Sequence, residues 1–350
     1  MAIRFWMISD RNVMSNGLGD ERAELSYWTS DAEKPEDLTN FRAWTRVRTA
    51  EAFQRAVLNV VNKFPPIRDP ELQLDQKHFT LFVHGYNTSW KDAIADYGKI
   101  WTNLFSREAD LGMCVLFSWP SEGLRLGYYP DRLMAREVAP DLADVLNRLY
   151  ERLADQQEST ARNQRHACFT KTSMIAHSMG NFVLQKAMQL AWTRQNQPLL
   201  SSLLNQLLMV AADVDNDLFK GGETVDQSDG DAIANLCYRI SVLFTGRDPV
   251  LGLSAGLKHF GKRRLGRSGL ADPCAVSDNV WQVDCSSLIS ANAKHIHSAY
   301  FEEARTIALM RGLLRGIDRQ VIVNEGLAPA TRPCPPNQPA PMLQPAVMPT

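Results

Sequence analysis

One short stretch of the chain constrains its fold more than any other. Residues 172–175 are β-branched or apolar apart from one serine, and no residue there would break a strand. The chain then turns through residues 176–180, which read Ala-His-Ser-Met-Gly. From Phe182 onward apolar residues recur at spacings of about three and four, as on one face of a helix. A serine at a sharp strand-to-helix turn is the pattern of a nucleophile elbow, which makes Ser178 a candidate nucleophile.

The residue types around Ser178 suit that role. The turn is tight, and Gly180 can adopt backbone conformations that are closed to larger residues. The start of the following helix directs free N–H groups and a partial positive charge at the serine oxygen, where an oxyanion would form. The pattern is A-x-S-x-G rather than G-x-S-x-G, and such a motif also arises by chance at structural turns. The rest of the chain must decide between the two interpretations.

Composition excludes several classes of protein. A length of 350 residues with 45% hydrophobic residues allows one large α/β domain or two ordinary ones, and a net charge of −1 predicts no nucleic-acid partner. Residues 1–10 do not resemble a signal peptide, and no apolar run approaches the ~18 residues of a membrane span. The cysteines are scattered without a C-x-x-C pair, which predicts reduced, mostly buried thiols and a cytoplasmic location. They are Cys114, Cys168, Cys237, Cys274, Cys285 and Cys334.

Strand-like runs alternate with helical patterns along the chain. Apolar runs rich in β-branched and aromatic residues are typical of buried parallel strands. The further expected strands are residues 78–84, 113–119, 203–213, 237–245 and 280–285, and the expected helices are 90–107, 131–154, 230–236 and one ending near residue 312. This alternation predicts an α/β fold with a doubly wound, mostly parallel sheet and helices on both faces.

The two ends of the chain complete the predicted organisation. Short strands at 2–10 and 23–30 and a helix at 42–64 are expected to join the main domain, and a proline-rich segment without periodicity is expected to be disordered. The predicted segments are residues 1–77 for the N-terminal strands and helix, 78–318 for the catalytic core and 328–350 for the tail.

Active groups of such a sheet lie beyond the carboxyl ends of its strands. The strand at 78–84 ends in His84-Gly85-Tyr86, where Gly85 would let a backbone N–H approach a substrate oxygen. We therefore expect an oxyanion hole formed by Gly85, Tyr86 and Met179, with His84 among the substrate-binding residues. The alternative is an ordinary strand–helix turn.

Candidates for a catalytic acid follow two later strands. Asp213 and Asp215 come after one strand, and Asp248 comes after the next, between Gly246 and Pro249. A tight turn would fix the direction of a carboxylate, which favours Asp248 while leaving the earlier strand as an alternative.

The acidic segment 213–217 also raises the question of a metal site. A calcium loop starting at Asp213 would need glycine at its sixth position and glutamate at its twelfth, but the twelfth is Thr224. We therefore expect no metal and no cofactor.

The candidate bases are His295 and His297, which follow the last strand. Two residues apart in an extended loop, they would point to opposite sides, so only one can face Ser178. His84 and His177 adjoin the serine but lie on segments unsuited to a base. The order serine, aspartate, histidine is that of the α/β-hydrolase triad.

Two further features are candidates for substrate contact. Residues 120–136 predict an irregular loop in which Tyr128 and Tyr129 overhang the site and bind substrate, or else pack among themselves. The basic run 258–267 is expected to be a solvated face, with contact to an anionic substrate or surface as the alternative.

Across residues 78–302 the chain resembles the uncharacterised bacterial α/β-hydrolases of an esterase/lipase-like family catalogued as a domain of unknown function. The matching segments are Phe82–Asn87, Phe117–Ser121, Ala176–Asn181, Ala212–Asp215, Arg247-Asp248, Arg264–Gly269 and His297–Phe301. The resemblance implies the triad Ser178, Asp248 and His297. One departure is an extra residue: Ser-Ala-Tyr follows His297 where the family pattern has His-Ser-Tyr.

These observations predict a serine hydrolase that cleaves a small-molecule carboxylic ester through an acyl-enzyme. An acyltransferase with the same triad and a non-catalytic binding protein of the same fold are the alternatives. The sequence leaves the acyl group, the alcohol and the oligomeric state open.

Overall fold

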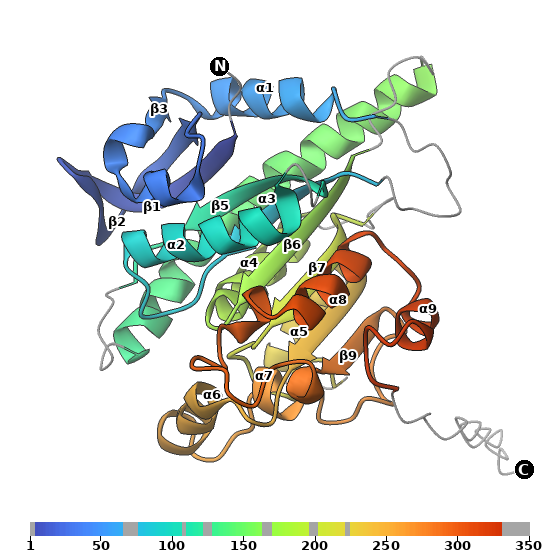
Figure 1. Ribbon diagram of the computed structural model, residues 1–350. Helices are drawn as coiled ribbons and strands as arrows, with labels where there is room; N and C mark the ends of the chain where they lie inside the picture. Colours follow the sequence, from blue (N-terminus) through green and yellow to red (C-terminus); the bar gives the residue numbers. More distant parts are fainter. Residues whose placement is uncertain are drawn as a thin grey trace, which may run out of the picture.

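A nine-stranded sheet forms the centre of the computed structural model, which describes residues 4–65, 76–106, 110–121, 128–162, 170–195, 202–220 and 225–330 (Figure 1). Within these residues the strand order is β3-β2-β1-β5-β4-β6-β7-β8-β9. The strands are β1 (Phe5–Met14), β2 (Gly17–Ser30), β3 (Thr45–Val47), β4 (His78–Val83), β5 (Gly112–Ser118), β6 (Lys171–His177), β7 (Leu204–Val210), β8 (Cys237–Phe244) and β9 (Val280–Asp284).

Most of the sheet is parallel. Strands β1 and β4 to β9 run in one direction, and only β2 runs antiparallel to its neighbours β1 and β3. Parallel neighbours need crossover connections, and these connections carry the helices. The carboxyl ends of β4, β6, β7, β8 and β9 therefore share one edge of the sheet, which is the edge expected to carry the site.

Helices cover both faces of the sheet (Figure 1). Helices α1, α3, α4 and α5 contribute to one buried apolar cluster, and α2, α8 and α9 contribute to the other. Their bounds are α1 (Ala50–Val61), α2 (Trp90–Ile100), α3 (Tyr128–Arg162), α4 (Gly180–Gln195), α5 (Val225–Leu236), α6 (Pro249–Leu253), α7 (Leu265–Ser268), α8 (Ala304–Leu314) and α9 (Arg319–Asn324). The predicted doubly wound architecture is confirmed.

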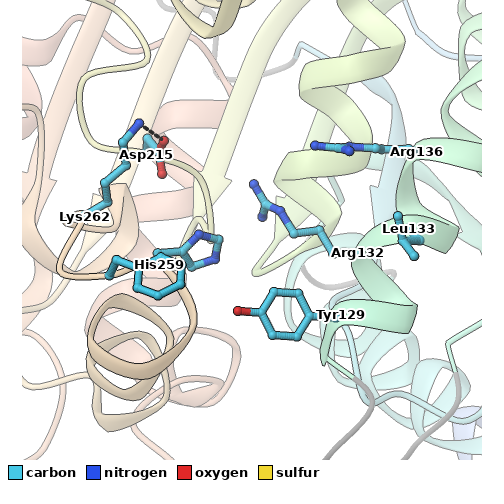
Figure 2. A pocket seen from close by; sticks show the side chains of 8 residues that line it. Tyr129, Arg132, Leu133, Arg136, Asp215, His259 and Lys262 are labelled. Carbon is cyan, nitrogen blue, oxygen red and sulfur yellow. Dashed lines mark hydrogen bonds and ion pairs between the residues drawn. The ribbon is translucent and has the colours of Figure 1, made fainter.

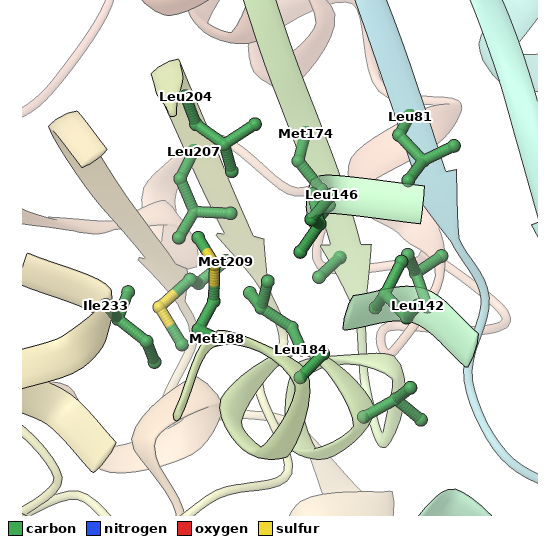
Figure 3. Packing of buried hydrophobic residues seen from close by; sticks show 14 of the residues in the cluster. Leu81, Leu142, Leu146, Met174, Leu184, Met188, Leu204, Leu207, Met209 and Ile233 are labelled. Atoms are coloured by element: carbon green, nitrogen blue, oxygen red, sulfur yellow. The ribbon is translucent and has the colours of Figure 1, made fainter. Parts of the chain in front are cut away.

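The larger apolar cluster fixes α3 and α4 against the sheet. Figure 3 shows Met174 of β6 and Leu207 of β7 facing Leu184 of α4 and Leu142 of α3. All four side chains are fully buried. Burying one such side chain contributes roughly 1.5–3 kcal/mol to folding, so this packing holds the start of α4 rigidly at the edge of the sheet.

Several predicted element boundaries are wrong; the strand expected over 23–30, for example, begins at Gly17. The helix expected over 42–64 begins only at Ala50, because Thr49 caps it by accepting a hydrogen bond from the Ala52 N–H (3.2 Å). The residues before it include β3, whose Thr45 and Val47 are β-branched and pair with β2. The loop expected over 120–136 is also shorter, since α3 already begins at Tyr128.

The cysteine prediction is only partly confirmed. Cys114, Cys237 and Cys285 are free and buried, and burial raises the pKa of each thiol. Cys274 is disulfide-bonded, so the expectation of reduced thiols is wrong at this position.

The predicted tail from residue 331 onward lies outside the described residues, and the predicted domain limits stay a prediction. In the described part of the chain, no helix combines the length and the apolar character that crossing a membrane requires.

Candidate active site

The turn between β6 and α4 holds Ser178 in a strained conformation. Its φ angle is +52°, in the left-handed region that non-glycine residues rarely occupy. The Ser178 N–H donates to the carbonyl of Val210 (3.0 Å), and the Ser178 carbonyl accepts from the N–H of Asp213 (3.1 Å) and of Asn181 (3.1 Å). Hydrogen bonds to the end of β7, to the segment after it and to the first turn of α4 thus hold Ser178 in a conformation that is unfavourable on its own.

Two glycines allow the neighbouring segments to approach the serine. A Cβ atom on Gly180 would lie 2.5 Å from the carbonyl oxygen of His84 and 2.6 Å from that of Val83. A Cβ atom on Gly85 would lie 2.8 Å from the Cβ of Ser178. No larger residue fits at either position without moving backbone, so the turn after β4 packs directly against the elbow.

The hydroxyl of Ser178 and one nitrogen of His297 are both buried and unused. Ser178 is 2% exposed, and neither its Oγ nor the Nε2 of His297 has a hydrogen-bond partner among the described residues. The other ring nitrogen of His297, Nδ1, lies 2.6 Å from Oδ2 of Asp248. Nδ1 of His297 is therefore bonded to a carboxylate, while Nε2 is available to accept a proton.

Asp248 is fixed in direction by the helix that follows it. Its Oδ1 accepts hydrogen bonds from the N–H groups of Val250 (2.9 Å) and Leu251 (3.0 Å), which makes it the N-cap of α6, with Pro249 at the first helical position. Asp248 is fully buried. Because one oxygen caps the helix, the other is held toward His297.

His177 and Arg247 hold the histidine loop, a role that the sequence did not suggest. The Nε2–H of His177 donates to the carbonyl of His297 (3.0 Å), and burial lowers the pKa of His177 to about 3, so its ring is neutral. Arg247 donates to the carbonyls of Ser286 (2.8 Å) and Ile289 (2.6 Å) after β9. The residues beside Ser178 and Asp248 thus tie the loop after β9 to the elbow and to the acid turn.

Asp213, the alternative acid, points to a different set of partners. Its Oδ1 accepts from Arg264 Nε (2.8 Å) and Ser254 Oγ (2.9 Å), and its Oδ2 accepts from the Tyr128 hydroxyl (2.9 Å). Burial acts to raise the pKa of Asp213, but Arg264, Arg132 and the hydrogen bonds from Ser254 and Tyr128 together outweigh it, and the pKa is lowered. The carboxylate bonded to His297 is therefore that of Asp248.

Arg264 corrects the expectation that the basic run is a solvated face. Its side chain is fully buried and forms ion pairs with both Asp213 and Asp215. Lys262, by contrast, is 61% exposed and pairs with Asp215 at 3.0 Å. The acidic segment at 213–217 is the sequence feature that could have indicated a buried arginine. A buried carboxylate needs a cation as its partner, and Arg264 is that cation.

The residues predicted for the oxyanion hole lie around the serine. Met179 is fully buried at the start of α4, and neither its N–H nor that of Gly85 forms a hydrogen bond within the described residues. Tyr86, partly buried, follows Gly85 and packs its ring against Tyr128 (5.4 Å between centroids). The assignment of these three residues stays a prediction, and the geometry is compatible with it.

His84 supports the turn instead of facing a substrate. Its Nδ1–H donates to the carbonyl of Gly85 (2.8 Å), and its Nε2 accepts from the N–H of Trp119 (3.2 Å), with the two rings stacked at 5.3 Å. Burial lowers the pKa of His84 to about 3. Both nitrogens are occupied, so the expected substrate contact is replaced by a positioning role for Gly85.

Tyr128 and Tyr129 separate into two roles. Tyr128 is 2% exposed and bonded to Asp213, and its hydroxyl also contacts Nε2 of His259, so it is part of the packed interior and does not overhang the site. Tyr129 is 54% exposed and lines a pocket of about 700 Å³ (Figure 2). Of the two, only Tyr129 lies where a substrate could reach it.

Within the described residues, no group of three or more His, Cys, Asp or Glu side chains is arranged to hold a metal ion. The expectation that the chain needs neither metal nor cofactor stays a prediction.

Comparison with known proteins identifies the family of this chain. Residues 71–313 match the family described as "Alpha/beta hydrolase of unknown function (DUF900)". The chain belongs to this family. Membership in this α/β-hydrolase family confirms both the predicted fold and the resemblance noted in the sequence. A comparison with curated proteins gives no match.

Solved structures that are similar to this DUF900 member are distant. One is a hyperthermophilic esterase from the archaeon Pyrobaculum calidifontis, with 11% identity, 69% of this chain and 77% of that chain covered, and a TM-score of 0.34. A lipase-esterase related protein from Clostridium acetobutylicum has 9% identity, coverage of 69% and 96%, and a TM-score of 0.30. Phospholipase PlaB from Legionella pneumophila has 15% identity, coverage of 71% and 64%, and a TM-score of 0.34. Similarity at this level carries no argument about activity.

Proposed function

We propose that this chain is a serine hydrolase that cleaves carboxylic esters through a covalent acyl-enzyme. The observation that carries the proposal is the contact of 2.6 Å between His297 Nδ1 and Asp248 Oδ2, on the same sheet edge as the strained Ser178. A histidine oriented by a buried carboxylate beside an unpaired serine hydroxyl is the arrangement that activates a serine.

The first half of the reaction forms the acyl-enzyme. Ser178 Oγ attacks the ester carbonyl carbon while its proton passes to Nε2 of His297. The resulting imidazolium is stabilised through Nδ1–H by Asp248. The oxyanion accepts hydrogen bonds from the N–H of Met179 and from the turn at Gly85 and Tyr86, and one such donor is worth ~3–4 kcal/mol. The intermediate collapses, and the leaving alkoxide takes the proton from Nε2.

The second half regenerates the enzyme. Water attacks the acyl carbon and gives a proton to Nε2 of His297, and the carboxylic acid leaves as Ser178 takes the proton back. The strained backbone of Ser178 supports this cycle because it presents the hydroxyl away from its own strand, at the N-terminus of α4.

Hydrolysis of p-nitrophenyl esters from acetate to octanoate tests the proposal. The purified protein is expected to hydrolyse part of this series, and Ser178→Ala is expected to lower kcat by roughly 10⁵–10⁶. Product analysis with an added alcohol separates hydrolysis from acyl transfer, because a transferase forms the new ester in place of the acid. Activity of Ser178→Ala equal to that of the wild type would reject the proposal.

A further inference from the structure

A pocket at the start of α3 has a lining that the triad does not use. It holds about 700 Å³ between the first turns of α3 and the segment that follows η5 (Ser254–Lys258). Its lining residues are Tyr129, Arg132, Leu133, Arg136, Asp215, His259, Phe260 and Lys262 (Figure 2).

Positive charge dominates this pocket. Arg132 and Arg136 lie one turn apart on α3, and Lys262 faces them, while the single carboxylate in the lining, Asp215, is already bonded to Arg264 and Lys262. Burial lowers the pKa of His259 to about 4, helped by Arg264 and Arg132, so this imidazole is neutral at pH 7. The two arginines therefore carry charge that the lining does not neutralise.

Arg132 is the clearest unsatisfied group. Its guanidinium stacks at 3.7 Å on the ring of Phe182, and its NH1 is buried without a hydrogen-bond partner among the described residues. Arg136 lies 5.6 Å from the same ring, and neither arginine forms an ion pair with a carboxylate in the described part of the chain. A guanidinium placed over an aromatic ring can still donate two parallel bonds to a carboxylate or phosphate.

The pocket adjoins elements that pack against the elbow. Phe182, under Arg132, lies in the first turn of α4, the helix that follows the Ser178 turn directly. Tyr128 adjoins the pocket residue Tyr129, packs on Tyr86 and bonds to Asp213. The N–H of Asp213 donates to the Ser178 carbonyl, and Gly85, which precedes Tyr86, packs against the Ser178 side chain.

The walls beside the arginines are apolar and open. Leu133 is 59% exposed and Phe260 is 96% exposed. Such walls suit the hydrocarbon part of a ligand whose charged end reaches the arginines.

We propose that this pocket binds an anionic group of the substrate, so that the enzyme prefers esters that carry a carboxylate or phosphate at the far end of a hydrocarbon chain. This inference rests on the proposed function for its link to catalysis, but binding of the anion depends only on the pocket. Arg132 is the main anion ligand, and Arg136 supports it.

Two esters of equal length test the preference. The substrates are p-nitrophenyl octanoate and mono-p-nitrophenyl suberate, which differ only in the terminal carboxylate. The wild type is expected to show a kcat/KM for the suberate about tenfold or more above that for the octanoate, as expected for one charged hydrogen bond. Arg132→Gln is expected to bring this ratio close to one, and Arg132→Lys to restore part of it.

A matched control comes from the same helix. Arg148 of α3 is 42% exposed and lies near Glu51, away from the pocket, so Arg148→Gln is expected to keep the wild-type ratio. If Arg132→Gln does not fold, Arg136→Gln, whose side chain is exposed, replaces it and is expected to lower the ratio several-fold. A wild-type ratio near one, or a ratio unchanged in the arginine variants, would overturn the inference.

Calorimetry separates this inference from the proposed function. Titration of the wild type with suberate, octyl phosphate and neutral octanol is expected to show binding of the anions only, weakened about tenfold in Arg132→Gln. The tighter of the two anions identifies a carboxylate or a phosphate as the preferred group. If no ester is hydrolysed, the proposed function fails while this binding still supports the pocket; equal affinities in wild type and variant would reject the pocket.

Discussion

Two buried aspartates at neighbouring strand ends have opposite surroundings. Asp248 follows β8 and faces His297, while Asp213 follows β7 and faces Arg264, Tyr128 and Ser254. A carboxylate bonded to a histidine can stabilise the imidazolium that forms when the histidine accepts a proton. A carboxylate bonded to an arginine faces a guanidinium that stays charged at every pH of interest and takes no part in proton transfer. The same residue type in the same position relative to the sheet thus serves chemistry in one case and structure in the other.

The largest loss of activity is expected when His297, the partner of Asp248, is replaced. His297→Ala removes the base and is expected to lower kcat for p-nitrophenyl esters by ~10⁶, close to the effect of losing the nucleophile. His295 is exposed, so His295→Ala is expected to retain most activity. Circular dichroism would check that both variants fold. A crippled His295→Ala with an active His297→Ala would transfer the role of base to His295.

The two aspartates can be compared directly. Asp248→Asn leaves the N-cap oxygen in place but offers His297 an amide, and kcat is expected to fall by about 10⁴. Asp213→Asn is expected to leave kcat per folded molecule within about an order of magnitude, because no bond to His297 is lost. The reverse ranking in steady-state kinetics would place the acid on the earlier strand.

For the free energy of unfolding, the larger loss is expected for Asp213→Asn rather than for Asp248→Asn. Asp213→Asn leaves Arg264, which is fully buried, without one of its two carboxylates, and a broken buried ion pair costs about 3–5 kcal/mol. Since the pKa of Asp213 is lowered in the folded protein, its contribution is present above the unfolded pKa and lost as pH falls. Urea denaturation at pH 7 and at pH values below 3.8 measures both effects, and a wild-type midpoint in Asp213→Asn at pH 7 would contradict them.

A third buried aspartate, Asp10, sharpens the comparison because it forms no ion pair within the described residues. Neither carboxyl oxygen of Asp10 has a hydrogen-bond partner among the described residues, and burial, with a smaller effect of Asp141, raises its pKa from 3.8 to about 8. The native state therefore holds a proton that the unfolded state releases between these values. Stability is expected to decrease as pH rises from 4 to 8, by up to ~1.4 kcal/mol per pH unit. Asp10→Asn is expected to flatten this slope in urea titrations; an unchanged slope would show that Asp10 is ionised in the fold.

Much of the architecture follows from local sequence patterns. The alternation of apolar runs with helical patterns predicts the parallel sheet, and a parallel sheet places the ends of β4, β6, β7, β8 and β9 along one edge. Ser178, two candidate acids and the His295/His297 pair could therefore be expected at one edge before any coordinates. The choice of Asp248 and His297 among them came from the family resemblance, which for Asp248 agrees with the tight turn.

The assignments that failed depend on contacts between distant segments. Arg264 reads as one of several exposed basic residues until Asp213, 51 positions earlier, is placed beside it. Tyr128 reads as a loop residue because its partner Asp213 is 85 positions away. His84 looks available until Trp119 of the next strand end occupies its Nε2. Local periodicity carries no information about such pairings.

The central proposal is that the fold activates Ser178 through His297 and Asp248. Labelling with a fluorophosphonate, followed by peptide mapping by mass spectrometry, tests this claim most directly. We expect one adduct, on Ser178, that forms far more slowly in Asp248→Asn and is absent from Ser178→Ala. Absence of labelling in the wild type, or an adduct on another residue, would contradict the claim.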